Sequence, residues 1–434
     1  MVTQSMKHWR RFSAHAIAAL ALAGTLSAQQ PLTLDEAIAR SLQVHPSMAQ
    51  ARAGLDNAGV SHRAAWGGFL PTLSLSSGAS TNSSQRFDAA TQRTVVGASQ
   101  SYNAGLSLSY SLFNGGQRFA NMDRARADIA AAEADMENQR FGVILQTKDL
   151  YFAALRQADL LEVALASVER AEESLANTRR RAELGSGTRS DTLRARLEVA
   201  NAMQSVLQAE AATRAARFAL GRQVGLPEPV MPELPDDLGP SPFALSEQEM
   251  FLLAEERSPA VRSARAAARA ASAAAGSSRA SRFPSLRVSS GYSWANREVA
   301  FDGGTTSWNV RLSGSYNVFD GFNRDQNIAR AENQERVAFV QEEDARLLVR
   351  AQVDGAVFAL RTSEQAIAIA IEARDVAEED LRVVQQRFDL SVATILDLIT
   401  SQIALVQAES GLVTARYDYA VARAQLEAIL GSEL

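Results

Sequence analysis

The sequence contains one pattern twice. Phe113, Gly115, Asp191 and Gly225 recur as Phe319, Gly321, Asp397 and Gly431, each 206 residues further along the chain. A repeat of this length indicates a duplicated fold unit and not a short solenoid module. Each copy has a segment of alternating apolar and polar residues followed by a long alanine-rich segment. We therefore expect two units that each combine a strand pair with long helices.

The distribution of proline divides the chain, because proline interrupts helices. No proline lies between Pro71 and Pro227 or after Pro284, whereas six lie in residues 226–243. Proline-rich segments of this kind are extended spacers. We therefore predict a first repeat at residues 29–225, a linker at 226–243 and a second repeat at 244–434.

Residues 1–28 have the composition of a cleaved signal peptide. Lys7, Arg10 and Arg11 precede a short apolar core at residues 16–23, and small residues follow at 27–28. That core is too short to span a bilayer, and no later segment approaches 18 consecutive apolar residues, which excludes a helical membrane protein. The absence of cysteine excludes disulfides, zinc–thiolate sites and the acylated cysteine of a lipoprotein.

One very long helix is predicted in each repeat, at residues 117–184 and 323–389. Both segments lack proline and are rich in alanine, glutamate and arginine. At 1.5 Å per residue each would be about 100 Å long, and such helices usually form coiled coils. Apolar residues in the last helix form two parallel heptad series, one of Leu398, Leu405, Leu412, Tyr419 and Leu426 and one of Ile399, Val406, Val413 and Ala420. A wall of helices and an ordinary helical bundle explain these two seams equally well.

Shorter helices should accompany the long ones. Returning helices are predicted at residues 190–224 and 394–431, and N-terminal helices at 33–67 and 246–281, split at Pro46 and Pro259. One N-terminal segment and one returning helix together have nearly the length of one long helix. We therefore expect the two to stack end to end beside it.

Strand hairpins are predicted at about residues 71–115 and 284–320. Apolar positions (Leu106, Leu108, Tyr110 and Leu112; Trp308, Val310, Leu312, Tyr316 and Val318) alternate with mostly polar ones. Long polar loops at 81–93 and 296–306 would lie at one end of the strands. Short turns bearing Gly115, Gly116 and Gly321 would lie at the helical end. Tyr110, Tyr292, Trp294, Trp308 and Tyr316 suit an aromatic belt at a membrane interface.

Alternation alone is also typical of a soluble sheet that covers a core. The export signal, long loops and aromatic residues favour strands in a membrane. A spanning sheet must close, because an open edge in lipid leaves backbone groups unpaired. Four strands are too few, so the barrel would be shared, with eight strands from two chains or twelve from three. A conduit favours three.

Several motifs resemble the TolC-like outer membrane factor family of Gram-negative bacteria. They are Leu32–Ala37 with His45-Pro46, Leu70–Leu73, Leu112–Gly116, Val318–Gly321, Leu184–Leu193 and Leu390–Leu398. Each match is weak, but their order, spacing and duplication make the set specific, and it covers the whole mature chain.

The resemblance implies a mainly helical homotrimer with a twelve-stranded barrel in outer-membrane lipid and a periplasmic helical tunnel. It also implies a passive exit duct for efflux or type I secretion. A periplasmic adaptor (membrane fusion protein) and an inner-membrane transporter of the RND, ABC or MFS type would be its partners. The exported substrate is not indicated.

In this family, inward coiling of the second-repeat helix pair closes the periplasmic end, where aspartates ring the constriction. Asp397 resembles the first such aspartate, and Thr400 occupies the place of the second. An inter-chain link would use Asp191, but Ala393 stands where the partner arginine is expected. Phe388 replaces a tyrosine and keeps the ring without the hydroxyl. Asp397 also has an alternative role as a helix cap, compatible with the ring.

The two helix tips are the expected docking points for the adaptor, although plain exposed turns explain them too. They comprise Leu184, Gly185 and Gly187 in the first repeat and Leu390, Ser391 and Ala393 in the second. Ser391 stands where the family usually has glycine. A positive φ there would cost about 1 kcal/mol, and a different turn geometry is equally compatible with the sequence.

An enzyme is not indicated. The mature chain has only His45 and His62, neither with metal-ligand spacing, and no phosphate-binding glycine loop. We predict no catalytic residue, metal or cofactor. The net charge of −5 gives no basis for binding nucleic acid. The alternative function is a periplasmic coiled-coil adaptor or scaffold with a soluble β-domain, which would usually have one helical hairpin per chain.

Overall fold

The computed structural model describes residues 31–432 apart from positions 91, 236–238, 240–245 and 301. The predicted signal peptide lies outside these residues. The helices are α1 (Leu34–Val44), α2 (Pro46–Gly67), α3 (Gln117–Glu183), α4 (Arg189–Gln223), α5 (Glu247–Arg257), α6 (Pro259–Arg279), α7 (Asn323–Asp389) and α8 (Ile395–Leu430). The strands are β1 (Thr72–Asp88), β2 (Arg93–Asn114), β3 (Ser285–Asn296) and β4 (Thr305–Ser315).

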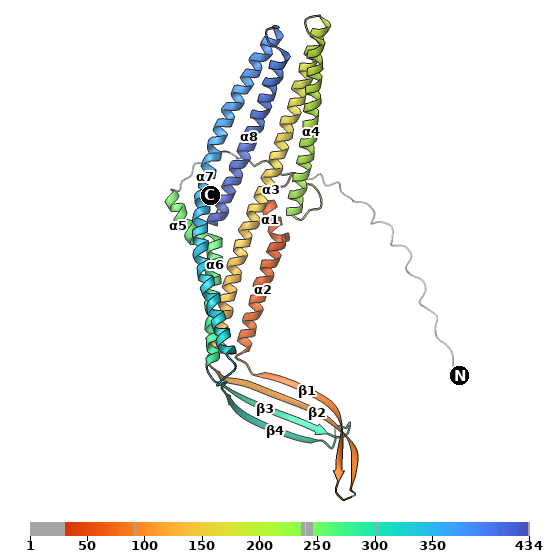
Figure 1. The fold of residues 1–434 in the computed structure, drawn as a ribbon, viewed down its shortest axis with the longest axis vertical. Helices are drawn as coiled ribbons and strands as arrows, with labels where there is room; N and C mark the ends of the chain where they lie inside the picture. Colours follow the sequence, from red (N-terminus) through yellow and green to blue (C-terminus); the bar gives the residue numbers. More distant parts are fainter. Residues whose placement is uncertain (1–30, 91, 236–238, 240–245, 301, 433–434) are drawn as a thin grey trace, which may run out of the picture.

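The two longest helices, α3 and α7, have 67 residues each, which corresponds to about 100 Å. In Figure 1, α2 lies beside the half of α3 nearer the sheet and α4 beside the other half. The second repeat has the same plan, with α6 and α8 along α7. The expected end-to-end stacking is therefore confirmed. Within the described residues, no helix has an apolar stretch long enough to cross a bilayer.

The heptad seam of α8 is part of the core of the helices. Leu398, Leu405, Leu412, Tyr419 and Leu426 are all buried, with at most 5% of each side chain exposed. Tyr419 and Leu426 pack with Val353 and Leu360 of α7. From the second seam, Ala420 packs instead with a cluster that contains Tyr151 and Phe152 of α3. Thus α8 has neighbours on two sides, as the double seam predicted.

Part of the proline-rich linker is bound to the helices. Leu32 and Pro232 form a parallel bridge, so the start of the chain and the linker run side by side. The Tyr151 hydroxyl shares its single hydrogen between the carbonyl oxygens of Leu32 and Glu233, which lie 2.9 Å and 2.6 Å from the hydroxyl oxygen. Burial raises the pKa of Tyr151 to about 12 and keeps this donor protonated. The described linker residues therefore clamp the middle of the first repeat.

The strands form one antiparallel sheet in the order β1-β2-β3-β4. The predicted loop at residues 81–93 is wrong, because β1 continues to Asp88 and β2 begins at Arg93. Ladder hydrogen bonds need no apolar side chains, so the polar sequence did not end the strands. The first hairpin therefore extends beyond the second (Figure 1). The loop predicted at 296–306 agrees closely with the connection between β3 and β4.

The fourth strand is shorter than predicted, since Tyr316 and Val318 lie beyond its end at Ser315. Ser315 pairs with Ser285, the first residue of β3. Pro284 precedes Ser285 and has no N–H with which to extend the ladder. The apolar–polar alternation therefore continues to Val318 in the sequence, but β4 ends at Ser315 because β3 offers no partner beyond Ser285.

The sheet has one apolar and one polar face. Leu73 pairs with Leu108, Leu106 with Tyr292, and Tyr292 with Trp308. On the opposite face, serine hydroxyls bond across strands, as in Ser74–Ser107 (2.6 Å) and Ser293–Ser307 (2.8 Å). No strand residue on the apolar face is charged.

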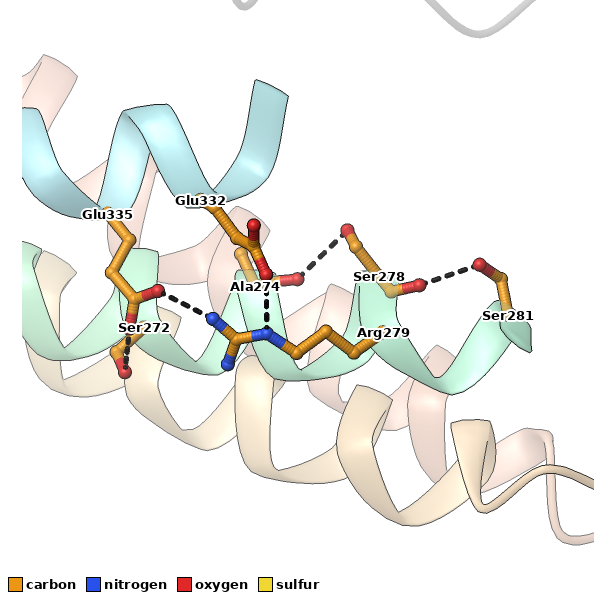
Figure 2. Close-up of polar contacts among 7 residues, drawn as sticks. All are labelled: Ser272, Ala274, Ser278, Arg279, Ser281, Glu332 and Glu335. Carbon is orange, nitrogen blue, oxygen red and sulfur yellow. Dashed lines mark hydrogen bonds and ion pairs between the residues drawn. The ribbon is translucent and has the colours of Figure 1, made fainter. Parts of the chain in front are cut away.

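Polar side chains join α6 to α7 near the sheet. Arg279 donates to the carboxylates of Glu332 (2.9 Å) and Glu335 (3.1 Å). The Ser272 hydroxyl donates to the other oxygen of Glu335, at 2.6 Å. Figure 2 shows Arg279 between the two glutamates. This network holds the first turns of α7, which follows the second hairpin, against α6, which precedes it.

The sheet-to-helix turns need left-handed backbone. Gly115 and Gly321 have φ of 67° and 69°, and Gly116 has 82°. A Cβ on Gly115 would lie 2.5 Å from the carbonyl oxygen of Ala280 and 2.5 Å from the Cβ of Phe283. Glycine at 115 therefore allows the two hairpins to approach at their helical end.

Candidate functional site

The two helix tips, Leu184–Gly187 and Leu390–Ala393, have the same backbone geometry. Gly185 and Ser391 have φ of 77° and 67°. The next N–H groups close each turn, from Ser186 to the Arg181 carbonyl (2.9 Å) and from Val392 to the Arg387 carbonyl (2.8 Å). Of the alternatives for Ser391, the positive φ is the one observed.

A capping box starts the returning helix at each tip. The Asp191 carboxylate accepts the N–H of Thr188 at 3.1 Å, and the Asp397 carboxylate accepts that of Thr394 at 2.8 Å. In return, each threonine hydroxyl accepts the N–H of the aspartate. Two backbone donors of each helix start are thereby satisfied. Asp397 therefore acts as a helix cap within one chain.

The capping contacts also keep Asp397 ionised. The Thr394 N–H, then the Thr394 hydroxyl and the charge of Arg387, hold the pKa of Asp397 below its ordinary value. Asp397 is exposed, and so is Thr400, whose hydroxyl donates to the Leu396 carbonyl at 2.9 Å. The structure thus places both predicted constriction residues on the exposed surface at the start of α8.

Arg181 joins the two tips and was not predicted from the sequence. Its guanidinium lies 4.4 Å from the centre of the Phe388 ring and donates to the Phe388 carbonyl. It also donates to the Ser391 hydroxyl at 2.7 Å. Phe388 itself is buried, with 5% exposed. One side chain of the first repeat therefore bonds both backbone and side chain of the second.

Only tertiary contacts identify Arg181. It ends a run of three arginines in the last turns of α3, where basic residues are expected because they complement the helix dipole. No motif links it to Phe388, 207 residues away. In the folded chain, Phe388 offers a ring and a carbonyl to Arg181, and Ser391 offers a hydroxyl.

Beneath the tips, an apolar cluster joins the repeats. It contains Leu175 and Val199 of the first repeat and Phe388, Ile395 and Leu398 of the second. The turns themselves are exposed, with 83% of Leu184 and 76% of Leu390 accessible. Gly187 and Ala393 are half-buried. The site thus has a buried apolar base and presents two leucines to solvent.

Among the described residues, no cluster of His, Cys, Asp or Glu side chains could hold a metal ion. The tips present exposed apolar side chains, exposed backbone at the turns, and ionised Asp397.

A family model for outer membrane efflux proteins matches residues 37–226 and 252–432 of the chain. No curated protein matches the sequence significantly. Among solved structures, the Campylobacter jejuni CmeC outer membrane channel has a TM-score of 0.80 at 17% identity, covering 92% of this chain and 85% of that chain. The Vibrio cholerae outer membrane protein VceC has a TM-score of 0.77 at 21% identity, with 92% and 96% covered.

The open-state MtrE outer membrane channel of Neisseria gonorrhoeae is similar to the same extent. Its TM-score is 0.76 at 23% identity, and the match covers 92% of this chain and 89% of that chain. At these identities the solved structures establish the fold.

Proposed function

Since the chain belongs to the outer membrane efflux protein family, we propose that it forms the passive exit duct of a tripartite efflux or type I secretion system. One observation carries the proposal. The four-stranded sheet has an apolar face without a charged residue and ends in two strands, β1 and β4, that have a partner on one side only. In lipid such edges must be paired.

Three chains would pair these edges in a closed barrel of twelve strands. The apolar face would contact lipid and the serine face would line the duct. The long helices would continue the duct into the periplasm for about 100 Å. Two helical hairpins per chain favour this arrangement over a periplasmic adaptor, for which we expect one.

The tips are the proposed periplasmic end. Their exposed Leu184 and Leu390 suit an apolar groove on a periplasmic adaptor, which would connect the duct to an inner-membrane RND, ABC or MFS-type transporter. Asp397 from three chains would form an acidic ring that attracts cations. Mutual repulsion in the ring would oppose the capping contacts that lower the pKa of Asp397.

The test is expression in a Gram-negative host followed by fractionation and bilayer recording. We expect the protein in the outer membrane, resistant to urea extraction, trimeric in mild detergent and able to conduct ions. Asp397→Ala should raise single-channel conductance and weaken block by multivalent cations.

Efflux by the same host tests the docking tips. Gly185→Trp together with Leu390→Glu should abolish export while leaving assembled trimers intact. A monomer that dissolves without detergent would contradict the duct, and unimpaired export by the tip variant would contradict the docking surface.

A further inference from the structure

Two arginines lie close together on the serine face near the helical end of the sheet. Arg287 in β3 pairs with Ser313, and Arg311 in β4 pairs with Ser289, so both lie on that face of neighbouring strands. Their positions are diagonal, which places the Cα atoms about 7–8 Å apart. Diagonal placement avoids the repulsion of like charges directly opposite one another, and it concentrates two positive charges at one level of the sheet.

These charges lack a nearby counter-charge. Both side chains are exposed, and in the described part of the chain neither forms an ion pair or donates a side-chain hydrogen bond. The only acidic residue in the four strands is Asp88, at the far end of β1. Through Ser109 and Ser289, Arg311 lies level with Thr72. Asp88 is thus about 50 Å away along the strand.

Towards the helices, the first acidic residue after β4 is Asp320. It lies five residues beyond Ser315 in the turn before α7, and its carboxylate accepts the N–H of Arg324 at 2.9 Å. The helical end of the serine face is therefore basic. The opposite, apolar face has no charge, so Arg287 and Arg311 belong to the water-filled side of a closed barrel.

We propose that Arg287 and Arg311 form a basic ring in the barrel wall that raises the permeability of the duct to anions. The substrates it suits are organic anions with carboxylate, sulfonate or phosphate groups. This inference rests on the proposed duct, in which three chains would place six arginines around one opening. Rings of charged side chains set the ionic selectivity of pores. The preference should weaken with salt, because the Debye length falls from about 30 Å at 0.01 M to about 8 Å at 0.15 M.

The experiment measures reversal potentials of purified trimers in planar bilayers under a KCl gradient at low ionic strength. Wild-type trimers should have a chloride-to-potassium permeability ratio above that of the Arg287→Ser/Arg311→Ser variant by at least roughly threefold. Serine matches the neighbouring residues of this face, so the barrel should still assemble. Arg287→Glu/Arg311→Glu should lower the ratio below that of the double serine variant.

Arg297→Ser is the matched control, because Arg297 lies in the loop after β3 and outside the strands. It should leave the permeability ratio near the wild-type value. If the wild type and the double serine variant both conduct with the same permeability ratio, the ring is overturned while the duct is kept. If Arg297→Ser lowers the permeability ratio as much as the double serine variant does, the ring is also overturned, because diffuse surface charge would then explain the effect. Trimers that insert and never conduct would contradict the duct and the ring together.

Discussion

Ser391 combines an unfavourable backbone conformation with a useful hydroxyl. Its φ of 67° costs roughly 1 kcal/mol relative to glycine, the residue at the equivalent position 185. The hydrogen bond that it accepts from Arg181 offsets about 0.5–1.5 kcal/mol. Since the two effects nearly cancel, the Ser391 side chain should change the free energy of unfolding little. Its contact with Arg181 should instead hold the second tip against the first.

We predict that Ser391→Gly leaves the free energy of unfolding within about 1 kcal/mol of the wild type, because relieved strain compensates for the lost contact. The freed tip should raise the mean conductance of trimers in planar bilayers. Ser186→Ala is the control, since the Ser186 hydroxyl donates to the Arg181 carbonyl within its own tip. Equal conductance of the wild type and Ser391→Gly would show that this contact does not hold the tip.

Glycines in the helices α3 and α4 have different structural roles. Gly221, in α4, packs against the linker, and a Cβ there would lie 2.2 Å from the Glu228 carbonyl oxygen. Gly142, in α3, has nothing within 4 Å of the position of a Cβ. The first glycine permits contact between two elements, whereas the second weakens its own helix.

Alanine substitution should therefore act in opposite directions in these two helices. Gly142→Ala should stabilise the protein by up to about 1 kcal/mol through higher helix propensity. Gly221→Ala should destabilise it by about 1–3 kcal/mol, as overpacking does. Urea unfolding followed by circular dichroism measures both. If Gly221→Ala is as stable as the wild type, the linker does not need close contact with α4.

In the whole molecule, the internal duplication specifies how chains should meet. Thr72 pairs with Ser109 as Ser285 pairs with Ser315. Ser109 also pairs with Ser289, four residues after Ser285. The equivalent of Ser289 is therefore Ser76, four residues after Thr72. In a closed barrel, Ser315 should face Ser76 of the neighbouring subunit.

Cysteine cross-linking tests this register against a clean background, because the chain has no cysteine. Oxidised Ser76→Cys/Ser315→Cys should migrate as a covalent trimer in denaturing electrophoresis, since directly opposed residues have Cβ atoms about 4.5–5.5 Å apart. Ser109→Cys/Ser289→Cys should instead form a bond within one chain and migrate as a monomer. If oxidised Ser76→Cys/Ser315→Cys migrates only as a monomer, the proposed register is wrong.

Local sequence determined the elements of this protein. Proline positions and apolar periodicity predicted the bounds of α3 and α7 to within one residue, because helix propensity and heptad spacing act over a few neighbouring residues. Strand ends were less predictable, as the extension of β1 to Asp88 shows. A polar strand is stabilised by its partner's backbone, and the sequence around it does not show where that partner ends.

The tertiary structure alone decided which distant groups meet. Arg181 reaches Phe388 and Ser391, and Tyr151 holds Leu32 against the linker, through contacts between residues far apart in the chain. These contacts depend on the rotation of each packed helix about its axis and on the path of the linker, and the helix and strand propensities of neighbouring residues specify neither. The sequence by itself therefore determined two repeats of hairpin and long helix, and packing decided how their tips and centre are tied.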